Sequence, residues 1–335
     1  MSEIKPFAGE DDRVWLKDVI PLSTPYTLNI FPSNVCNFKC SYCAQSLPED
    51  IWNEEYKVRK EMMQDDVIDL IVEQSKAFSD KYKLISMMGH GEPLCNRKLP
   101  EYIEKIKKAD ICKRIDIITN ASLLTYEYSD ELIDAGLDVL RVSLQGITSE
   151  SYKNTSNVNI DFGRLYDNLT YFYKKSRGKC KLYVKTMDVT LSDNETSKFY
   201  ELFNDITDRM YIDKVKPVYS QVEYTDEEKD MTTDRYGVRH SHRIVCPQPF
   251  YMMSVWPNGD VTACDALYKS GMLGNVKSES LRSMWTSDIH KAFCKDQLFG
   301  GRFTNARCKQ CCAPDDVAHK EDILDDERKE LLLKF

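Results

Sequence analysis

Cys36, Cys40 and Cys43 follow an apolar, β-like stretch in the run PSNVCNFKCSYC, which begins at Pro32. Three thiolates leave one iron of a four-iron cluster without a protein ligand, and an open iron can bind a substrate or a cofactor. Zinc is the alternative, but it takes four ligands and no fourth Cys or His lies near this loop. The spacing therefore favours an iron–sulfur centre with one open coordination site.

The pattern Cys-x3-Cys-x2-Cys, with Tyr42 before the last cysteine, resembles the signature of the radical S-adenosylmethionine (radical SAM) superfamily. In that family SAM binds the open iron through its amino and carboxylate groups, and its reductive cleavage yields a 5′-deoxyadenosyl radical that abstracts a substrate hydrogen. The resemblance implies a [4Fe-4S] cluster on Cys36, Cys40 and Cys43, with Tyr42 beside the cofactor. The cofactor supplies the difficult chemistry and the protein positions it.

A second motif, MGHGEP at 88–93, follows the next β-like run and resembles the Gly-Gly-Glu-Pro motif of the same family. Glycines let the backbone approach a ligand closely, and a carboxylate can accept charge-assisted hydrogen bonds from the methionyl ammonium of SAM. By resemblance Gly89, Gly91 and Glu92 contact SAM, while His90 departs from the commonest form. An ordinary turn after a strand is the alternative.

Two further strand ends carry polar residues. Asn120 follows one β-like run, and RVSLQG at 141–146 resembles the family's Ser-Leu-Asp-Gly strand, which implies that Ser143 bonds the SAM carboxylate. Related enzymes often place an arginine shortly after that serine, but the stretch 151–155 has none, so Lys185 is a possible substitute. Simple turn or strand-end chemistry remains the other interpretation of these residues.

Apolar runs alternate with helical patterns between residues 26 and 215, which is typical of βα units with a parallel sheet. The expected strands are 26–32, 83–88, 114–119, 139–144, 182–189 and 209–212, and the expected helices are 64–79, 100–109, 128–136, 162–175 and 195–206. The sequence thus predicts an α/β fold, a partial (β/α)6 TIM-type barrel. Its active site should lie at the carboxyl ends of the strands, where the motifs stand.

A polar, charged stretch at 216–245 separates the barrel from a second group of cysteines. Cys246 and Cys264 flank two β-like runs around Asn258-Gly259, a strong hairpin signal, and Cys308 and Cys311 form a Cys-x2-Cys pair. The segments 273–276 and 280–285 resemble those of SPASM domains, the auxiliary-cluster extensions of radical SAM enzymes. We therefore expect a C-terminal α+β auxiliary iron–sulfur domain built from a β-hairpin and a helix.

Full SPASM domains continue with further cysteines, and this sequence has none after Cys312. One auxiliary [4Fe-4S] cluster on Cys246, Cys264, Cys308 and Cys311 is therefore expected, as in the Twitch-type variant found in 2-deoxy-scyllo-inosamine dehydrogenase; a four-cysteine zinc site is the alternative. Among the other cysteines, Cys294 and Cys312 could pack in the core or donate a hydrogen atom to a substrate radical, and packing is favoured. We interpret the remaining three as packing residues: Cys95, Cys112 and Cys180.

These motifs predict a domain order. An N-terminal extension (1–25) precedes the radical SAM partial barrel (26–215), a linker or substrate loop (216–245), the SPASM/Twitch auxiliary domain (246–320) and a C-terminal tail (321–335). Within the linker, Arg239, His240, His242 and Arg243 could lie over the active site, but a solvated linker is the favoured interpretation.

The composition of the 335-residue chain is that of a globular protein, with 42% apolar and 30% charged residues. A formal charge of −8 argues against nucleic-acid binding. No signal peptide or membrane-spanning run is apparent, so we expect a cytoplasmic location. There the twelve cysteines should be reduced thiols and metal ligands rather than disulfides.

An auxiliary cluster can accept the electron released when an alcohol carbon becomes a ketone, which favours a dehydrogenase. Return of a hydrogen atom from a cysteine would instead give an epimerase. Many peptide-modifying members carry a separate recognition domain, and few residues precede the first expected strand. A sugar, aminosugar or cyclitol substrate is therefore favoured, with a peptide-modifying maturase and a metal-binding protein without radical chemistry as alternatives. The resemblance also implies flavodoxin or ferredoxin as electron donor.

Overall fold

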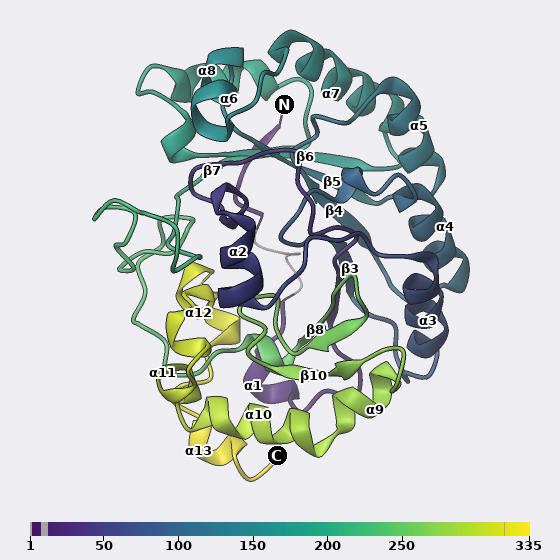
Figure 1. The fold of residues 1–335 in the computed structure, drawn as a ribbon, viewed down its shortest axis with the longest axis vertical. Helices are drawn as coiled ribbons and strands as arrows, with labels where there is room; N and C mark the ends of the chain where they lie inside the picture. The colour runs from purple at the N-terminus through teal and green to yellow at the C-terminus, as the bar shows by residue number, and fades with distance from the viewer. Residues whose placement is uncertain (1, 8–12, 318) are drawn as a thin grey trace.

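The computed structural model describes residues 2–7, 13–317 and 319–335. Within these residues one ten-stranded sheet runs in the order β1-β7-β6-β5-β4-β3-β2-β8-β9-β10 (Figure 1). Its central six strands are parallel. They are β2 (Thr27–Ile30), β3 (Leu84–Met87), β4 (Ile115–Thr119), β5 (Val139–Leu144), β6 (Lys181–Met187) and β7 (Arg209–Asp213). The predicted six-stranded partial barrel is confirmed.

Helices cover the outer face of these strands, as Figure 1 shows. They are α3 (Asp65–Ser75), α4 (Leu99–Ala109), α5 (Tyr126–Asp134), α6 (Ser149–Ser156), α7 (Phe162–Ser176) and α8 (Glu195–Phe203). The sequence patterns had not indicated α6, because it is short and polar and only Tyr152 and Ser156 are buried. Two shorter segments follow the first barrel strand, α2 (Glu49–Ile51) and a π-helical turn (Trp52–Tyr56).

Local chemistry explains where these helices begin and end. In α4 the buried residues Leu99, Tyr102, Ile103 and Ile106 recur at helical spacing, so one face packs on the sheet. Asp110 ends that helix in the left-handed conformation, with φ of 54°.

The first barrel strand is shorter than the predicted 26–32. Its pairing with the neighbouring strand ends at Ile30, before Pro32, which has no N–H to donate.

The predicted C-terminal hairpin forms around Asn258-Gly259, between β8 (Met252–Val255) and β9 (Asp260–Thr262), and β10 (Met272–Asn275) pairs with β9. The sequence did not predict where this hairpin docks. Strand β8 pairs in parallel with β2, so the C-terminal strands extend the barrel sheet. The pairing buries Met253 and Val255 in the same apolar cluster as Leu28 and Ile30.

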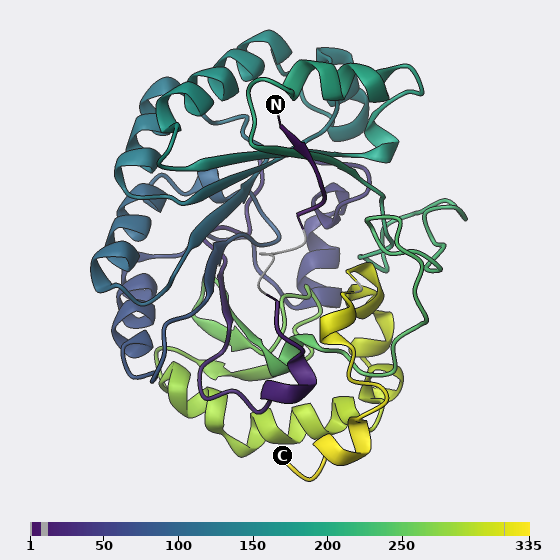
Figure 2. The same cartoon turned by 180° about the vertical axis from the view of Figure 1, so that it is seen from behind.

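Short helices complete the C-terminal part: α9 (Leu281–Thr286), α10 (Asp288–Leu298), α11 (Gly301–Thr304), α12 (Ala313–Asp316) and α13 (Arg328–Leu331). Figure 2 shows α1 (Leu16–Val19) beside this C-terminal segment. Leu16 and Ile20 pack there against Leu298, Leu324 and Leu331 in one apolar cluster. Residues at both ends of the chain therefore contribute to the core.

The N-terminal residues also contribute a strand. β1 (Glu3–Ile4) pairs in parallel with β7 at the far edge of the sheet, and a two-residue strand carries no periodic signal in the sequence. No helix in the described ranges is both long and apolar enough to cross a membrane.

Candidate active site and cluster-binding loops

The N-terminal cysteine loop leaves the carboxyl end of β2 and is held by α6. Backbone N–H groups of Lys39 and Ser41 donate to the carbonyls of Ser156 (3.1 Å) and Thr155 (2.9 Å). Cys40 Sγ lies 3.1 Å from the Ser156 hydroxyl, and Cys36 Sγ accepts from the N–H of Phe38 at 3.4 Å. The unpredicted helix α6 therefore fixes the course of the loop.

These thiols lie in surroundings that disfavour free thiolates. Cys40 is 8% exposed, and burial raises its pKa to about 12, while burial also raises the pKa of Cys36 and Cys43. Thiolates persist in such a place when metal ions supply compensating positive charge. Among the described residues, no three His, Cys, Asp or Glu side chains are grouped to hold one metal ion.

The glycines of the second motif make room for the cysteine loop. A Cβ on Gly91 would lie 2.4 Å from the carbonyl oxygen of Ser33 and 2.6 Å from that of Val35. Gly89 has φ of +139°, and its Cβ would meet the Phe31 ring at 2.9 Å. Only glycine therefore permits the two loops to approach each other so closely, as a shared ligand site at the strand ends requires.

Glu92 is only 2% exposed and connects the ends of β3 and β4. Its carboxylate accepts from the backbone N–H groups of Leu94 (3.0 Å) and Asn120 (2.8 Å) and from the Thr119 hydroxyl. Burial raises the pKa of Glu92 to about 7, against the effect of these hydrogen bonds. The carboxylate thus orders the neighbouring strand end, and its contact with a SAM ammonium stays a prediction.

The other expected SAM contacts lie on the next strands in order. Asn120 follows β4 and donates from Nδ2 to Asn37 in the cysteine loop at 3.0 Å. Ser143 on β5 stands opposite Lys185 on β6 in the sheet register. Lys185 Nζ lies 2.5 Å from Asp213 Oδ2, and burial lowers the pKa of that lysine. A SAM carboxylate would therefore share Lys185 with Asp213.

Tyr42 also has a partner in this group of loops. Its hydroxyl donates to Gln145, which follows β5. The structure thus places all the predicted N-terminal site residues at the carboxyl ends of β2 to β6. Their direct contact with a cofactor stays a prediction.

The four C-terminal cysteines of the predicted auxiliary site surround one small cavity of about 20 Å³. They come from three separate segments of the chain: Cys246, Cys264, Cys308 and Cys311. Gln297 is fully buried on α10 and donates from Nε2 to Cys308 Sγ at 3.8 Å. Arg302 lies on the wall of the same cavity.

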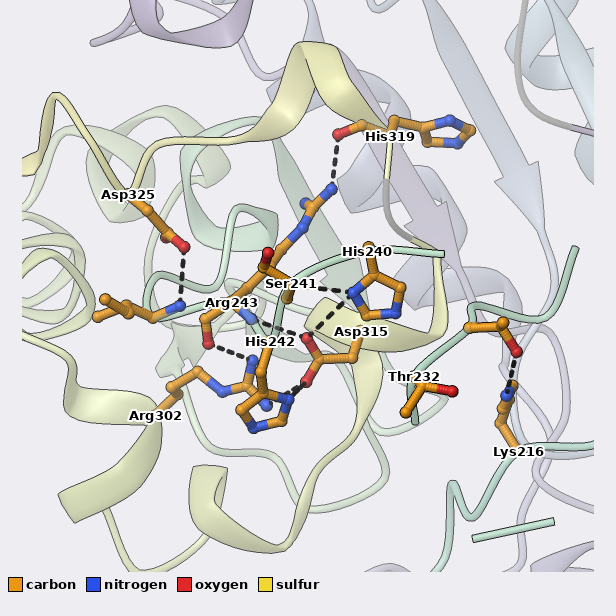
Figure 3. Close-up of polar contacts among 12 residues, drawn as sticks. Lys216, Thr232, His240, Ser241, His242, Arg243, Arg302, Asp315, His319 and Asp325 are labelled. Carbon is orange, nitrogen blue, oxygen red and sulfur yellow. Dashed lines mark hydrogen bonds and ion pairs between the residues drawn. The ribbon is translucent and has the colours of Figure 1, made fainter. Parts of the chain in front are cut away.

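Two carboxylates hold the segment that leads into Cys246, as Figure 3 shows. Asp315 is completely buried and accepts from the backbone N–H of Arg243 at 2.9 Å and from the Arg302 guanidinium at 2.7 Å. His242 Nδ1 lies 2.8 Å from the same carboxylate. Asp325 accepts from the backbone N–H groups of Ile244 and Val245, at 3.0 and 2.9 Å. These contacts fix the approach to the auxiliary site.

The solvated-linker interpretation of residues 239–243 is therefore wrong in part. Arg239 is exposed, as expected. Arg243 is 3% exposed and donates to the His319 carbonyl at 2.6 Å, and the His240 side chain is 9% exposed. The reason is the Asp315 carboxylate, whose burial requires several donors around it.

His90 connects the two cysteine regions. Its Nε2–H donates to the carbonyl of Asp265 at 2.8 Å, and its Nδ1 lies 3.4 Å from the Tyr219 hydroxyl. The ring stacks on Trp256 with centroids 5.5 Å apart. Burial lowers the pKa of His90 to about 4, so the imidazole is neutral at pH 7. His90, which departs from the commonest form of the motif, thus contacts Asp265, the residue that follows Cys264.

A group of buried and half-buried charged residues lies near both regions. Arg235 pairs with Asp316 through Nε–Oδ1 at 2.9 Å and a second contact. Asp213 also acts electrostatically on Arg235, and Arg235 in turn acts on Asp265, whose pKa is raised by burial. We call Lys185, Asp213, Arg235, Asp265 and Asp316 the charged cluster. Sequence reasoning had singled out only Lys185, because isolated charges in loops carry no spacing signal.

The two unassigned cysteines differ. Cys294 is fully buried in the apolar cluster with Leu16 and Leu298, in keeping with a packing residue. Cys312 is 9% exposed, and the charges of Asp316 and Arg235 act on it. Its surroundings are therefore polar, unlike those of a cysteine that only fills the core.

Comparison with known proteins adds two domain matches. Residues 30–201 match the radical SAM superfamily, which is just over half of the chain, and residues 246–312 match the SPASM iron–sulfur cluster-binding domain. A probable GTP 3′,8-cyclase of Methanococcus maripaludis is 41% identical over 128 residues, 38% of each chain. The GTP 3′,8-cyclase of Staphylococcus haemolyticus is 30% identical over 147 residues, 43% of this chain and 41% of its own length. The matches thus span about two fifths of these relatives.

Solved structures share the fold over most of the chain. BtrN in complex with AdoMet and 2-DOIA is 18% identical, with a TM-score of 0.53 and coverage of 85% of this chain and 92% of BtrN. SuiB of Streptococcus suis is 16% identical, with a TM-score of 0.64 and coverage of 90% and 73%. The expected fold is confirmed, as are the expected cofactors, iron–sulfur clusters and SAM. The chain belongs to the radical SAM superfamily and carries a C-terminal SPASM iron–sulfur domain.

Proposed function

We propose that this radical SAM enzyme is an oxidoreductase that acts on a carbohydrate-like small molecule, such as a sugar, aminosugar or cyclitol. The observation that carries the proposal is the charged cluster, in which residues from the barrel, the linker and the C-terminal domain meet. A polyhydroxylated or amino-bearing substrate offers donors and acceptors that match such a set. A largely apolar substrate would remove water from these charges without offering them hydrogen bonds.

The proposed metal ligands follow from the geometry of the two cysteine regions. Cys36, Cys40 and Cys43 would hold the SAM-binding cluster, and the four cysteines around the C-terminal cavity would hold one auxiliary cluster. When bound, these groups supply a hydrogen-abstracting radical and an electron acceptor. Conversion of an alcohol carbon to a ketone removes one hydrogen atom, one proton and one electron.

The chain's own residues have distinct proposed tasks. Glu92, Asn120 and Ser143 position SAM at the strand ends. Lys185 bonds the SAM carboxylate in place of the missing arginine, and Asp213, which pairs with Lys185, orients the substrate at the carboxyl end of the barrel. We assign the barrel to residues 26–215, the linker to 216–245 and the auxiliary domain to 246–320.

The state of the cysteines supports a reducing location for the enzyme. All twelve cysteines lie in the described ranges and are free thiols there. We therefore propose a cytoplasmic enzyme that flavodoxin or ferredoxin reduces, since a reducing compartment keeps such ligands as thiols.

An epimerase is the second candidate, and Cys312 favours it. This cysteine adjoins Arg235 and Asp316 of the charged cluster, so a thiol hydrogen could reach a bound substrate radical. A Cys312→Ser variant separates the two candidates. It should abolish an epimerisation but leave ketone formation largely intact.

The test is product analysis under strictly anaerobic conditions. The holoenzyme, SAM and a one-electron reductant are incubated with aminosugars, cyclitols and, in parallel, short peptides. We expect one 5′-deoxyadenosine and one ketone per turnover with a member of the first group. Modification of peptides alone would favour the maturase alternative, for which SuiB bound to its precursor peptide SuiA is a precedent in fold.

Asp213→Asn tests the charged cluster directly. Loss of the carboxylate should lower kcat/KM by about tenfold or more, since one partner of a buried pair is removed, while Asp193→Asn at an exposed loop position should have no effect. If Asp213→Asn folds poorly, Lys185→Met with Asp213→Leu removes both charges together and avoids an unpaired buried lysine. Unchanged turnover in a folded variant would contradict the role of the cluster.

A further inference from the structure

A second cavity lies at the opposite end of the barrel from the cysteine loops. Its volume is about 730 Å³, within the range of small-molecule sites. Thr27, Leu84, Val139 and Lys181 line it, and each is the first residue of its strand. The cavity is therefore the amino-terminal mouth of the barrel, whereas the predicted SAM and cluster residues stand at the carboxyl ends.

The mouth is strongly cationic although the whole chain carries a charge of −8. Seven lysines and arginines line it, against three aspartates. Those aspartates have partners: Asp138 accepts from the N–H of Ile115 at 2.7 Å and contacts Lys107 at 2.9 Å. Asp208 accepts from the N–H of Leu182 at 2.7 Å. The third, Asp322, pairs with Arg13. The negative charge in the mouth is thus already engaged.

Most of the cations are not engaged in this way. No ion pair within the described ranges involves the following five: Lys83, Lys113, Arg177, Lys179 and Lys181. Lys83 is partly buried, and the other four are exposed at the rim. Like charges gathered around a concave, low-dielectric wall focus the field and raise the local concentration of anions. The shape and charge of the mouth thus fit an anionic ligand.

Aromatic rings form another part of the wall. Tyr26, Tyr173 and Tyr251 line the cavity, and Lys83 Nζ lies 4.0 Å from the centre of the Tyr26 ring. Phenol groups offer both a flat apolar face and a hydroxyl donor. A ligand with a planar ring and an anionic tail could use the tyrosines and the cationic rim together.

We propose that the amino-terminal mouth of the barrel is a second ligand site for a phosphate-bearing small molecule of nucleotide size. The phosphates would lie at the lysine and arginine rim, and the organic part would lie against the tyrosines. This site is separate from the proposed reaction, because its lining residues include none of the predicted cluster ligands or SAM contacts.

Calorimetry with ATP and with pyrophosphate tests the site on SAM-saturated holoenzyme, in which the adenosyl position is already filled. The test variant is Lys113→Ala with Lys181→Ala, and the matched control is Lys198→Ala with Lys229→Ala, two exposed lysines away from the cavity. We expect saturable 1:1 binding of ATP that weakens with added salt. The test variant should bind about tenfold more weakly, since two charge-assisted contacts are lost, and the control should bind as the wild type does.

Tyr173→Leu probes the aromatic wall. It should weaken ATP binding and leave pyrophosphate binding unchanged. The proposal is overturned by absence of saturable binding at low salt, by equal weakening in the control, or by unaltered affinity in the test variant. Binding of reduced flavodoxin that the test variant weakens, without binding of ATP or pyrophosphate, would also overturn it, since the mouth would then dock a protein. Because binding is measured without turnover, failure here leaves the proposed reaction untouched.

Discussion

Replacement of His90 by phenylalanine should change how the stability of the protein depends on pH. The imidazole is enclosed by Phe31, Trp256 and Tyr219 and donates to the Asp265 carbonyl. Burial lowers its pKa from 6.5 to about 4. Below pH 6.5 the imidazole is therefore protonated in the unfolded chain but stays neutral in the folded protein. The contribution of His90 to the free energy of unfolding is thus present above pH 6.5 and is lost as the pH falls towards 4.

The size of the effect follows from these two pKa values. Between pH 7.5 and 5.5, linkage gives a loss of about 1.3 kcal/mol for a fully enclosed imidazole. His90 retains some exposure, and solvent screening reduces the expected loss to about 1 kcal/mol. At pH 7.5 the phenylalanine variant should be less stable by about 1–2 kcal/mol, because the Asp265 carbonyl loses its donor. That deficit should largely disappear at pH 5.5.

The assay is anaerobic urea unfolding of the wild type and the His90→Phe variant at both pH values. All other titrating groups contribute equally to the two proteins, so the difference between them isolates His90. His90→Gln is the matched control, since it also lacks the titration and should give the same change with pH from a different starting stability. Parallel pH dependences of the wild type and both variants would refute the reasoning.

Three further outcomes are expected. Gly91→Ala should lower iron content and the thermal midpoint, because its Cβ would lie 2.4 Å from a carbonyl oxygen of the cysteine loop. Gly163→Ala in the first turn of α7 is the control, since its Cβ would lie 3.3 Å from the Asp161 carboxylate, and it should change the midpoint far less; equal midpoints of the two variants would contradict this. Gln297→Leu should shift the reduction potential of the auxiliary cluster to a more negative value, because the reduced cluster loses a hydrogen bond at Cys308. Gln310→Leu is the control and should leave the potential unchanged, since the Gln310 side chain accepts from the Ser220 hydroxyl instead. An unchanged potential in Gln297→Leu would exclude the role of Gln297. Replacing all three N-terminal cysteines by alanine should reduce about eight irons to about four, and zinc in place of iron would disprove both cluster assignments.

The sequence predicts the barrel and its loops well because each signal there is local. Strand runs such as 139–144 are rich in Val and Leu, although Arg141 and Ser143 interrupt them, and parallel strands that are buried on both faces have such an apolar composition. The glycines and Glu92 stand next to a strand end, so their region of the fold follows from topology alone. Helix α6 gave no such signal, since its partners are backbone groups of the cysteine loop.

Contacts between distant segments could not be predicted in this way. Asp213, Arg235 and Asp316 come together only after the linker and the C-terminal helices have packed on the barrel. The docking of β8 on β2 depends on which sheet edge is free, a property of the assembled fold. The cationic mouth likewise joins strand starts that lie far apart in the sequence.

Because β8 pairs in parallel with β2, the radical SAM region and the SPASM region share one sheet and should not fold separately. A chain cut before Cys246 would lose β8 and leave β2 as an exposed edge strand, with its backbone N–H and C=O groups unpaired. Leu28 and Ile30 would lose apolar neighbours at the same time. Such a fragment should aggregate rather than fold, so the radical SAM and SPASM regions behave as one cooperative unit and are not interchangeable parts.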